Sequence, residues 1–221
     1  MGKHSDSIDK KVLNRISSHG RGWVFTPSHF DDLAGSSTLT TILKRHSDAG
    51  TIRNLARGLY DYPKTDPQLG LLQPAVDDIA QALAGRDEIR LQPSGAYAAN
   101  LLGLSTQVPM KVVYLTDGRS RIVQVGKRQI ILRNTTPKNM ATAGKISGLI
   151  IQALKDLGKD RVDDHIIDKL DRRLDDAARK QLMKDIRSAP AWIADIFRKL
   201  ATPQNDKACT VSSHSQKNAV G

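Results

Sequence analysis

Several kinds of residue are scarce in this 221-residue sequence, and each scarcity excludes a class of protein. There is one cysteine, Cys209, so the chain can form no internal disulfide and no cysteine-rich metal site, which favours a reducing compartment. No apolar run approaches the roughly 20 residues that cross a bilayer. No apolar stretch follows the basic N-terminus, as it would in a secretory leader. We therefore predict a cytoplasmic protein that does not associate with a membrane.

Carboxylates in a catalytic arrangement are equally scarce. Glu88 is the only glutamate, and the pattern Asp-Xaa-Asp occurs nowhere in the chain. Two-metal phosphoryl transfer needs closely placed carboxylates, so the chain is not expected to be a nucleotidyltransferase. It also lacks a Walker-type glycine loop, a dinucleotide fingerprint, His-Glu-Xaa-Xaa-His and Gly-Xaa-Ser-Xaa-Gly. We predict a protein that is not an enzyme and that uses no metal and no cofactor.

Positive charge is abundant and unevenly spread. The net charge is +11, and residues 110–145 carry eight basic side chains against the single acidic Asp117. Such a balance is typical of proteins that bind polyanions, most often nucleic acid. The basic segment is either a second surface for DNA, RNA or a protein partner, or a set of edge charges that discourage strand pairing between molecules. The six residues predicted to form this possible second surface are Lys111, Arg119, Arg121, Lys127, Arg128 and Arg133.

The first 66 residues follow the order of a winged helix-turn-helix. Apolar spacing and turn residues predict a helix over 8–16, a strand over 23–26, a short helix from 27, a helix capped by Ser36 or Ser37, and a hairpin of strands 52–55 and 58–62. In that fold the second helix of the pair enters the major groove, and the hairpin, or wing, contacts the adjacent backbone or minor groove.

The helix that starts at residue 36 or 37 has a polar face suited to DNA. Hydroxyls and cations donate to phosphates and base edges, and Arg53 and Arg57 flank the hairpin, where a wing meets phosphates. The plain alternatives are a solvated helix face and cations that favour a helix C-terminus. The predicted DNA-contacting residues on the helix are Ser37, Thr38, Thr40, Thr41, Lys44 and Arg45.

A second domain is expected over residues 70–200, after a polar, proline-bearing connection at 65–70. Its sheet region, 88–134, contains predicted strands at 89–91, 111–116, 121–125 and 129–133, with Asp117-Gly118 as a hairpin turn between the second and third. Residues 144–200 have helical spacing, and the polar tail 202–221 is predicted to be disordered. The predicted fold class is α+β: a winged helix-turn-helix over 1–66, then a mixed domain of a small antiparallel sheet and a C-terminal helical bundle.

Four long runs of the sequence resemble antitoxins of the AbiEi type, and more narrowly a branch of unknown function that lies beside predicted nucleotidyltransferases. The runs are Trp-Val-Phe-Thr-Pro-Ser-His-Phe-Asp-Asp-Leu from residue 23, Gly-Thr-Ile-Arg-Asn-Leu-Ala-Arg-Gly-Leu-Tyr-Asp-Tyr-Pro from residue 50, residues 93–109, and Tyr-Leu-Thr-Asp-Gly from residue 114. The resemblance covers roughly residues 5–200. Long runs of this kind are more specific than any single motif.

The resemblance implies a two-domain antitoxin. Its winged helix would bind inverted repeats in its own promoter as an autorepressor, and the rest would neutralise a nucleotidyltransferase toxin, in that group usually without a stable complex. The family's DNA-contacting helix maps onto residues 37–46 and its wing onto 52–60, with Asn54 where a second arginine is expected. The alternative is a ligand-responsive winged-helix transcription factor unconnected with a toxin, although nine aromatic residues offer no cluster that marks a ligand pocket.

Overall fold

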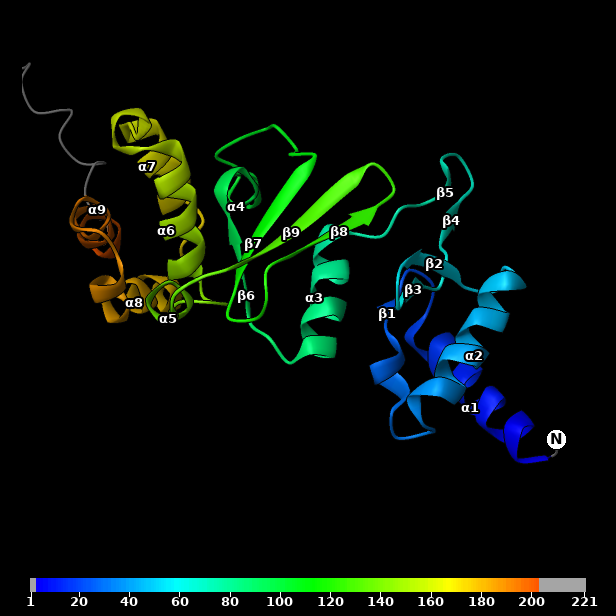
Figure 1. The fold of residues 1–221 in the computed structure, drawn as a ribbon. Helices are drawn as coiled ribbons and strands as arrows, with labels where there is room; N and C mark the ends of the chain where they lie inside the picture. The colour runs from blue at the N-terminus through cyan, green and yellow to red at the C-terminus, as the bar shows by residue number, and fades with distance from the viewer. Residues whose placement is uncertain (1–2, 203–221) are drawn as a thin grey trace, which may run out of the picture.

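The computed structural model describes residues 3–202 and has a mixed α+β fold (Figure 1). The predicted α+β class is confirmed: small sheets lie between N-terminal helices and a helical C-terminal region. The predicted tail at 202–221 lies outside the described residues except for Thr202, and so does Cys209. Among the described residues, none of the helices combines the length and the apolar character needed to cross a membrane.

The N-terminal unit alternates helices with short strands. Its strands form an antiparallel sheet in the order β1-β3-β2. The apolar stripe of α2 packs on α1 and η1 in a core that contains Ile16, Phe30 and Leu43. The cap of α2 is Gly35, so the prediction that Ser36 or Ser37 caps this helix was wrong, and both serines lie in its first turn. The elements are α1 (Lys3–His19), β1 (Val24–Phe25), η1 (Pro27–Phe30), α2 (Ser36–Asp48), β2 (Arg53–Ala56) and β3 (Leu59–Asp61).

The connection after this unit is a small hairpin, β4 (Thr65–Asp66) and β5 (Gly70–Leu71), where the sequence predicted only a polar linker. The Asp66 carboxylate accepts hydrogen bonds from the backbone N–H groups of Gln68 at 2.8 Å and Leu69 at 2.9 Å, which closes the turn. Gly70 has φ +71°, a conformation that favours glycine. Aspartate and glycine thus fold a segment that has no buried apolar residue.

A four-stranded sheet forms the centre of the molecule, in the order β6-β7-β9-β8. Strands β7 and β9 pair in parallel, and the other neighbours pair antiparallel. The first strand begins at Leu91 and not at residue 89. The elements are α3 (Val76–Asp87), β6 (Leu91–Ser94), α4 (Gly95–Leu101), β7 (Lys111–Thr116), β8 (Arg121–Val125) and β9 (Arg128–Asn134).

The predicted hairpin at Asp117-Gly118 was wrong, because β9 lies between β7 and β8. Fully buried Ile130 and Leu132 give β9 a central position. Asp117 has another role, since its carboxylate accepts from the backbone N–H of Arg90 at 2.9 Å and from the Arg90 guanidinium at 2.8 Å. This pair fixes the end of β7 beside the segment that leads into β6. Strands β8 and β9 form a hairpin instead, with Val125 opposite Arg128.

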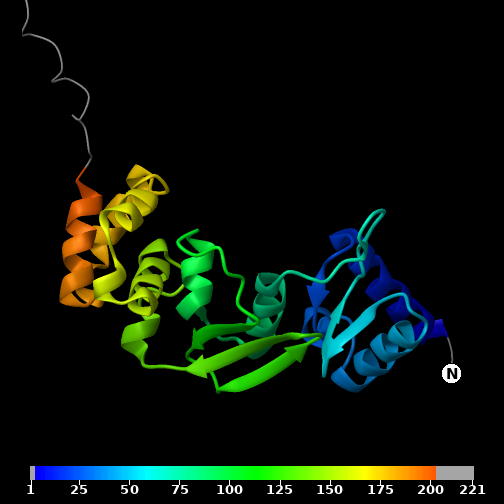
Figure 2. The same ribbon diagram turned by 90° about the horizontal axis from the view of Figure 1, so that it is seen from above.

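One apolar cluster joins the N-terminal unit to the central sheet. This α3 cluster contains Val24 and Leu59 from the first sheet, Ile79 and Leu83 from α3, and Ile130 from β9 among its buried members. Figure 1 shows α3 beside the N-terminal unit, and Figure 2 shows it against one face of the central sheet. The predicted domain boundary near residue 70 therefore separates two units that share buried surface.

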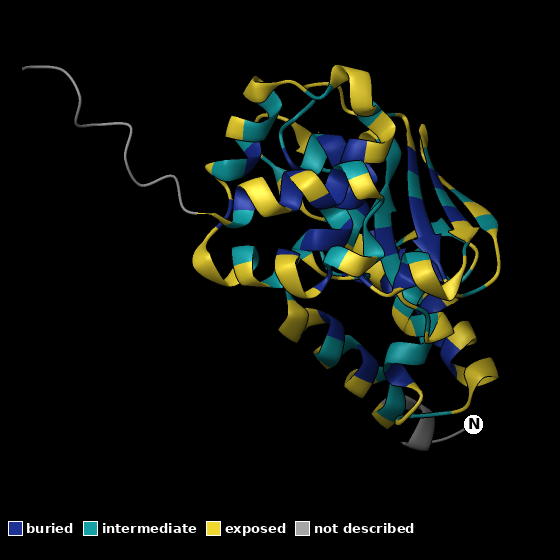
Figure 3. Cartoon of the chain, turned by 90° about the vertical axis from the view of Figure 1, so that its left-hand side faces the viewer, coloured by how far each residue is buried: buried dark blue, intermediate teal, exposed yellow. Residues whose placement is uncertain are grey.

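The C-terminal region is helical and packs on the edge of the sheet through α6. Figure 3 shows buried residues gathered along the inner faces of these helices. Leu154 of α6, Leu182 of α8 and Phe197 of α9 are fully buried in one cluster with α4. The elements are α5 (Pro137–Met140), α6 (Ile146–Leu157), η2 (Lys159–Arg161), α7 (Asp164–Asp171), α8 (Asp176–Lys184), η3 (Ile186–Ser188) and α9 (Ala191–Ala201).

Two helical glycines provide a matched test of this packing. A Cβ at Gly148 would overlap the Thr142 carbonyl oxygen and lie 2.6 Å from the Gln92 side-chain oxygen, so Gly148→Ala should lower the free energy of unfolding by about 1–3 kcal/mol. Gly85 in α3 has open space around it, so Gly85→Ala should raise stability by about 0.5–1 kcal/mol. Urea denaturation measures both, and equal effects would refute the close approach of α6 to β6.

Candidate nucleic-acid interface

The outer surface of α2 presents the predicted DNA-contacting residues together. Leu39, Ile42 and Leu43 are buried against α1 and η1, so the opposite side of the helix faces solvent. We call its exposed residues the α2 polar face. Asp48, at the last position, is the only acidic residue in the helix. The members of the α2 polar face, all exposed, are Ser37, Thr38, Thr40, Thr41, Lys44 and Arg45.

Two of the three threonine hydroxyls on this face, those of Thr40 and Thr41, already donate within the helix. Thr40 Oγ1 donates to the Ser36 carbonyl at 2.8 Å, and Thr41 Oγ1 donates to the Ser37 carbonyl at 3.0 Å. Each hydroxyl has one proton, so these side chains offer lone pairs to a partner and not the donor groups that the sequence predicted. Hydrogen-bond donation to phosphates then depends on Lys44 and Arg45, with the hydroxyls of Ser37 and Thr38 as further donors.

The two cations of the α2 polar face are differently constrained. The Lys44 side chain is 76% exposed, and its ammonium lies 3.9 Å from the Asp48 carboxylate. Arg45 pairs with Asp9 of α1, and His46 Nε2 lies 2.8 Å from the same carboxylate oxygen. Burial opposes ionisation of Asp9, yet the hydrogen bonds from His46 and Arg45 hold the pKa of that carboxyl below its usual value. Asp9 thereby fixes α2 on α1 while Arg45 stays exposed.

Arg53 does not lie where a wing arginine was predicted to meet phosphate. Its guanidinium makes a two-pronged pair with Asp61, Nε to Oδ1 at 3.0 Å and Nη2 to Oδ2 at 2.5 Å, and also donates to the Leu72 carbonyl at 3.0 Å. The Asp61 side chain is 2% exposed. A carboxylate so buried requires a charged partner, and Arg53 supplies it. This correction removes Arg53 from the candidate interface.

The turn of the β2–β3 hairpin lies beside the central sheet. Gly58 has φ +68°, and Leu59 directly after it is buried in the α3 cluster. Leu55 and Ala56 pack against the same cluster, which draws the turn toward α3 and β8. Arg57 is exposed at this turn, where it lines a cleft with residues of β8. The predicted wing is therefore covered on one side by the second half of the chain.

The predicted second basic surface is divided between two ends of the central sheet. Lys111, Lys127 and Arg128 lie where β7 and β9 begin, and Arg119, Arg121 and Arg133 lie near where these strands end. A six-residue strand separates the two groups by about 20 Å. Arg121 points inward and pairs with Asp87, whereas the other five are exposed. The two groups do not form one continuous surface.

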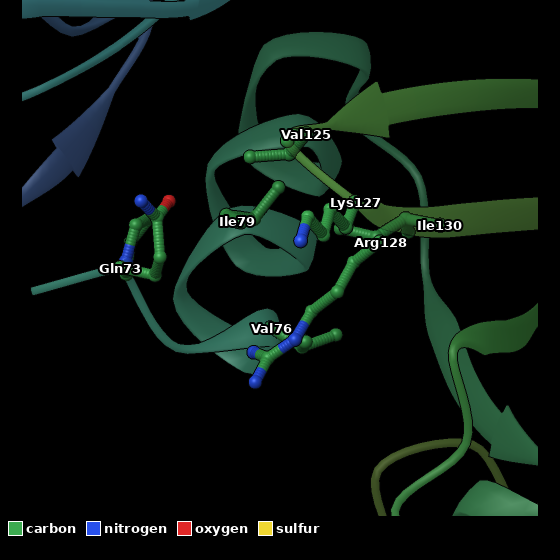
Figure 4. Close-up of a pocket in the computed structure, with 9 residues that line it drawn as sticks. Gln73, Val76, Ile79, Val125, Lys127, Arg128 and Ile130 are labelled. Carbon is green, nitrogen blue, oxygen red and sulfur yellow. The ribbon is translucent and has the colours of Figure 1, made fainter.

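One of these basic groups flanks a small pocket. Lys127 and Arg128, from the β8–β9 turn, lie beside Val76 and Ile79 of α3, and Gln73 lies across from them (Figure 4). The pocket has a volume of about 280 Å³. Its apolar floor and cationic rim fit a small ligand with one apolar and one anionic end.

The side chains that organise these surfaces were missed by the sequence analysis. Asp9, Asp61 and Asp87 each pair with an arginine at least eight residues away, and two of the three partners are more than 30 residues distant. The local spacing of residues in the sequence does not predict such pairs. The one feature in the sequence that suggests a structural ion pair is an aspartate in an otherwise apolar strand, as in Leu-Tyr-Asp, because a carboxylate buried there needs a charged partner.

Comparison with known proteins identifies a family whose function is unknown. The profile described as Family of unknown function (DUF6088) matches residues 11–182, which is most of the chain. No curated protein matches the chain, and no solved structure matches it.

The Arg53–Asp61 pair can be tested by removing one partner. Arg53→Ala leaves the Asp61 carboxylate buried without a counter-charge, so the free energy of unfolding should fall by about 3 kcal/mol or more. The control is Arg90→Ala, which breaks the exposed pair with Asp117 and should cost less than about 1 kcal/mol. Urea denaturation followed by circular dichroism measures both. An Arg53→Ala loss no larger than the control would mean that the pair contributes nothing.

Proposed function

We propose that this chain, which belongs to the Family of unknown function (DUF6088), is a DNA-binding transcriptional repressor of the winged helix-turn-helix type and an antitoxin of the AbiEi type. The observation that carries the proposal is the α2 polar face, which presents two cations and four hydroxyl side chains while the other side of the helix packs in the core. Such a face can contact phosphates and base edges in a major groove.

The arrangement of the N-terminal unit supports the winged-helix assignment. A helix, a strand, a short helix, a longer helix and a hairpin follow one another, and the strands pair in the order β1-β3-β2. In such a domain α2 would be the recognition helix. The β2–β3 hairpin would be the wing, with Arg57 as its basic residue and Arg53 reserved for Asp61.

The antitoxin half of the proposal rests on the resemblance of the four sequence runs. Under it, the chain acts in the cytoplasm and binds inverted repeats in its own promoter. It also neutralises a cognate nucleotidyltransferase toxin, directly or indirectly, and is itself neither an enzyme nor dependent on a cofactor. The residues outside the N-terminal unit, including the C-terminal helices, would be needed for neutralisation.

A second candidate is a ligand-responsive transcription factor. The pocket of about 280 Å³ beside Lys127 and Arg128 favours it, because a small molecule there would contact both α3 and the β8–β9 turn. The two candidates share the DNA-binding step. An adjacent, co-transcribed gene with a nucleotidyltransferase signature would favour the antitoxin, and a metabolic operon would favour the ligand-responsive regulator.

DNA binding is tested by a gel-shift titration of the full chain against the duplex upstream of its own gene. Replacing Lys44→Ala together with Arg45→Ala should weaken binding at least about tenfold at physiological salt, because each lost contact contributes about 1–3 kcal/mol. The fold should persist, since both side chains are exposed and Asp9 keeps its contact with His46.

The matched control is Lys180→Ala with Lys184→Ala, which removes the same charge from exposed positions of α8. Figure 1 shows α8 at the opposite end of the molecule from α2. This variant should bind the duplex nearly as well as the unaltered chain. If both double variants lose affinity equally, binding follows net charge alone and α2 is not the interface.

Neutralisation is tested by co-expressing the full chain with the neighbouring toxin and measuring growth. The Lys44→Ala, Arg45→Ala variant should still rescue growth from a heterologous promoter, because the α2 polar face is assigned to DNA alone. Loss of rescue by this folded variant would show that the two activities share a surface.

A further inference from the structure

A cleft lies between the N-terminal unit and the central sheet. One wall is the turn of the β2–β3 hairpin, the second is the last turns of α3, and the third is β8. Its volume is about 520 Å³, within the range of small-ligand sites. Its walls come from three separate parts of the chain, so no local pattern in the sequence marks this place.

Three arginines line this cleft, and we call it the arginine cleft. They are Arg57 from the hairpin turn, Arg86 from α3 and Arg121 from β8, and the described lining residues include no carboxylate. The Arg86 guanidinium lies beside the hairpin, since a Cβ placed on Gly58 would be 3.8 Å from Arg86 Nη1. Three cations from distant segments therefore converge on one space.

Only part of this charge is neutralised within the described residues. Asp87 accepts from Arg86 Nε at 2.9 Å and also pairs with Arg121, so two guanidinium groups share one carboxylate. Arg57 forms no ion pair with the side chains that the structure describes, those of residues 7–202. The cleft keeps a net positive charge.

The Arg121 guanidinium is incompletely satisfied. Its Nη2 pairs with the Asp87 carboxylate, whereas its buried Nε has no hydrogen-bond acceptor among the described residues. Burial and the neighbouring Arg86 lower the pKa of Arg121, and Asp87 opposes this shift. Buried donors without acceptors are costly, so an acceptor supplied by a ligand would stabilise the site.

We propose that the arginine cleft binds a phosphoryl group, with the rest of a mononucleotide-sized ligand against its apolar wall. Guanidinium forks match the paired oxygens of a phosphate, and convergent arginines are the side chains that hold one. Leu83, Ile122 and Val123 provide apolar surface next to the charges. The phosphoryl group comes either from a free phosphate ester or from a duplex backbone.

Occupancy of the cleft would connect two parts of the molecule. Arg57 belongs to the N-terminal unit, whereas Arg86 and Arg121 belong to the second half of the chain. A phosphoryl group bound by all three fixes the hairpin turn against β8. The proposal shares Arg57 with the predicted wing and uses none of the α2 polar face. Binding of a free phosphate ester does not rest on the proposed function, whereas binding of a duplex backbone does.

The experiment measures thermal unfolding of the full chain against increasing inorganic phosphate and, separately, adenosine monophosphate, with chloride at matched ionic strength. Each probe should raise the melting temperature saturably. Arg57→Gln and Arg86→Gln should each weaken the apparent affinity at least about tenfold, as expected for loss of a charge-assisted contact. Arg172→Gln, an exposed position at the end of α7, removes the same charge elsewhere and should behave like the unaltered chain.

A second arm separates the two sources of phosphate. If the free probes do not bind, but Arg57→Gln and Arg86→Gln weaken promoter binding in a gel shift while Arg172→Gln does not, the cleft holds a backbone phosphate. If neither the free probes nor the duplex depends on Arg57 and Arg86, the proposal is wrong. If the chain binds phosphate saturably but does not bind its promoter, the phosphoryl site is supported and the proposed function is wrong. Failure of the phosphoryl site and failure of the proposed function are therefore distinguishable.

Discussion

The α3 cluster is the contact on which the rest of the structure depends. Leu59 and Val24 enter it from the first sheet, and Ile130 and Leu132 enter it from the central sheet. Because Leu59 directly follows the hairpin turn, burying it sets the direction of the whole β2–β3 hairpin. The same packing brings Arg57 to β8 and leaves α2 on the outer side of the N-terminal unit. Packing of this one apolar cluster thus forms the walls of the arginine cleft and leaves the α2 polar face exposed to solvent.

Ion pairs between different elements fix the positions of the hairpin and of α2 more closely than the apolar cluster does alone. Arg53 neutralises buried Asp61 and reaches the Leu72 carbonyl, which links the hairpin to the chain that leaves the N-terminal unit. Asp9 of α1 holds Arg45 and His46 of α2. In both places a carboxylate serves as a local anchor for cations on another element. Lys44 and Arg57 have no such anchor on another element, and Arg45 stays exposed beside Asp9, so all three are available to an anionic partner.

The sequence predicted well where local spacing decides the structure. The α2 stripe of Leu39, Ile42 and Leu43 has helical period, and the hairpin is marked by Gly58, so both elements appear near their expected positions. Prediction was wrong where distant segments compete. Asp117-Gly118 has the composition of a hairpin turn, yet the more apolar β9 takes the place beside β7. Arg53 and Arg121 were expected at a surface. Arg53 instead pairs with the buried Asp61, and Arg121 pairs with Asp87, and local spacing in the sequence reveals neither pair.

The central claim is that the α2 polar face is where this chain meets DNA, and amide chemical-shift mapping during titration with the promoter duplex tests it most directly. The account predicts that the largest shifts fall on residues 37–45, with smaller shifts near Arg57 and almost none in α8 and α9. Shifts concentrated on the C-terminal helices, or spread evenly over every basic residue, would contradict the account.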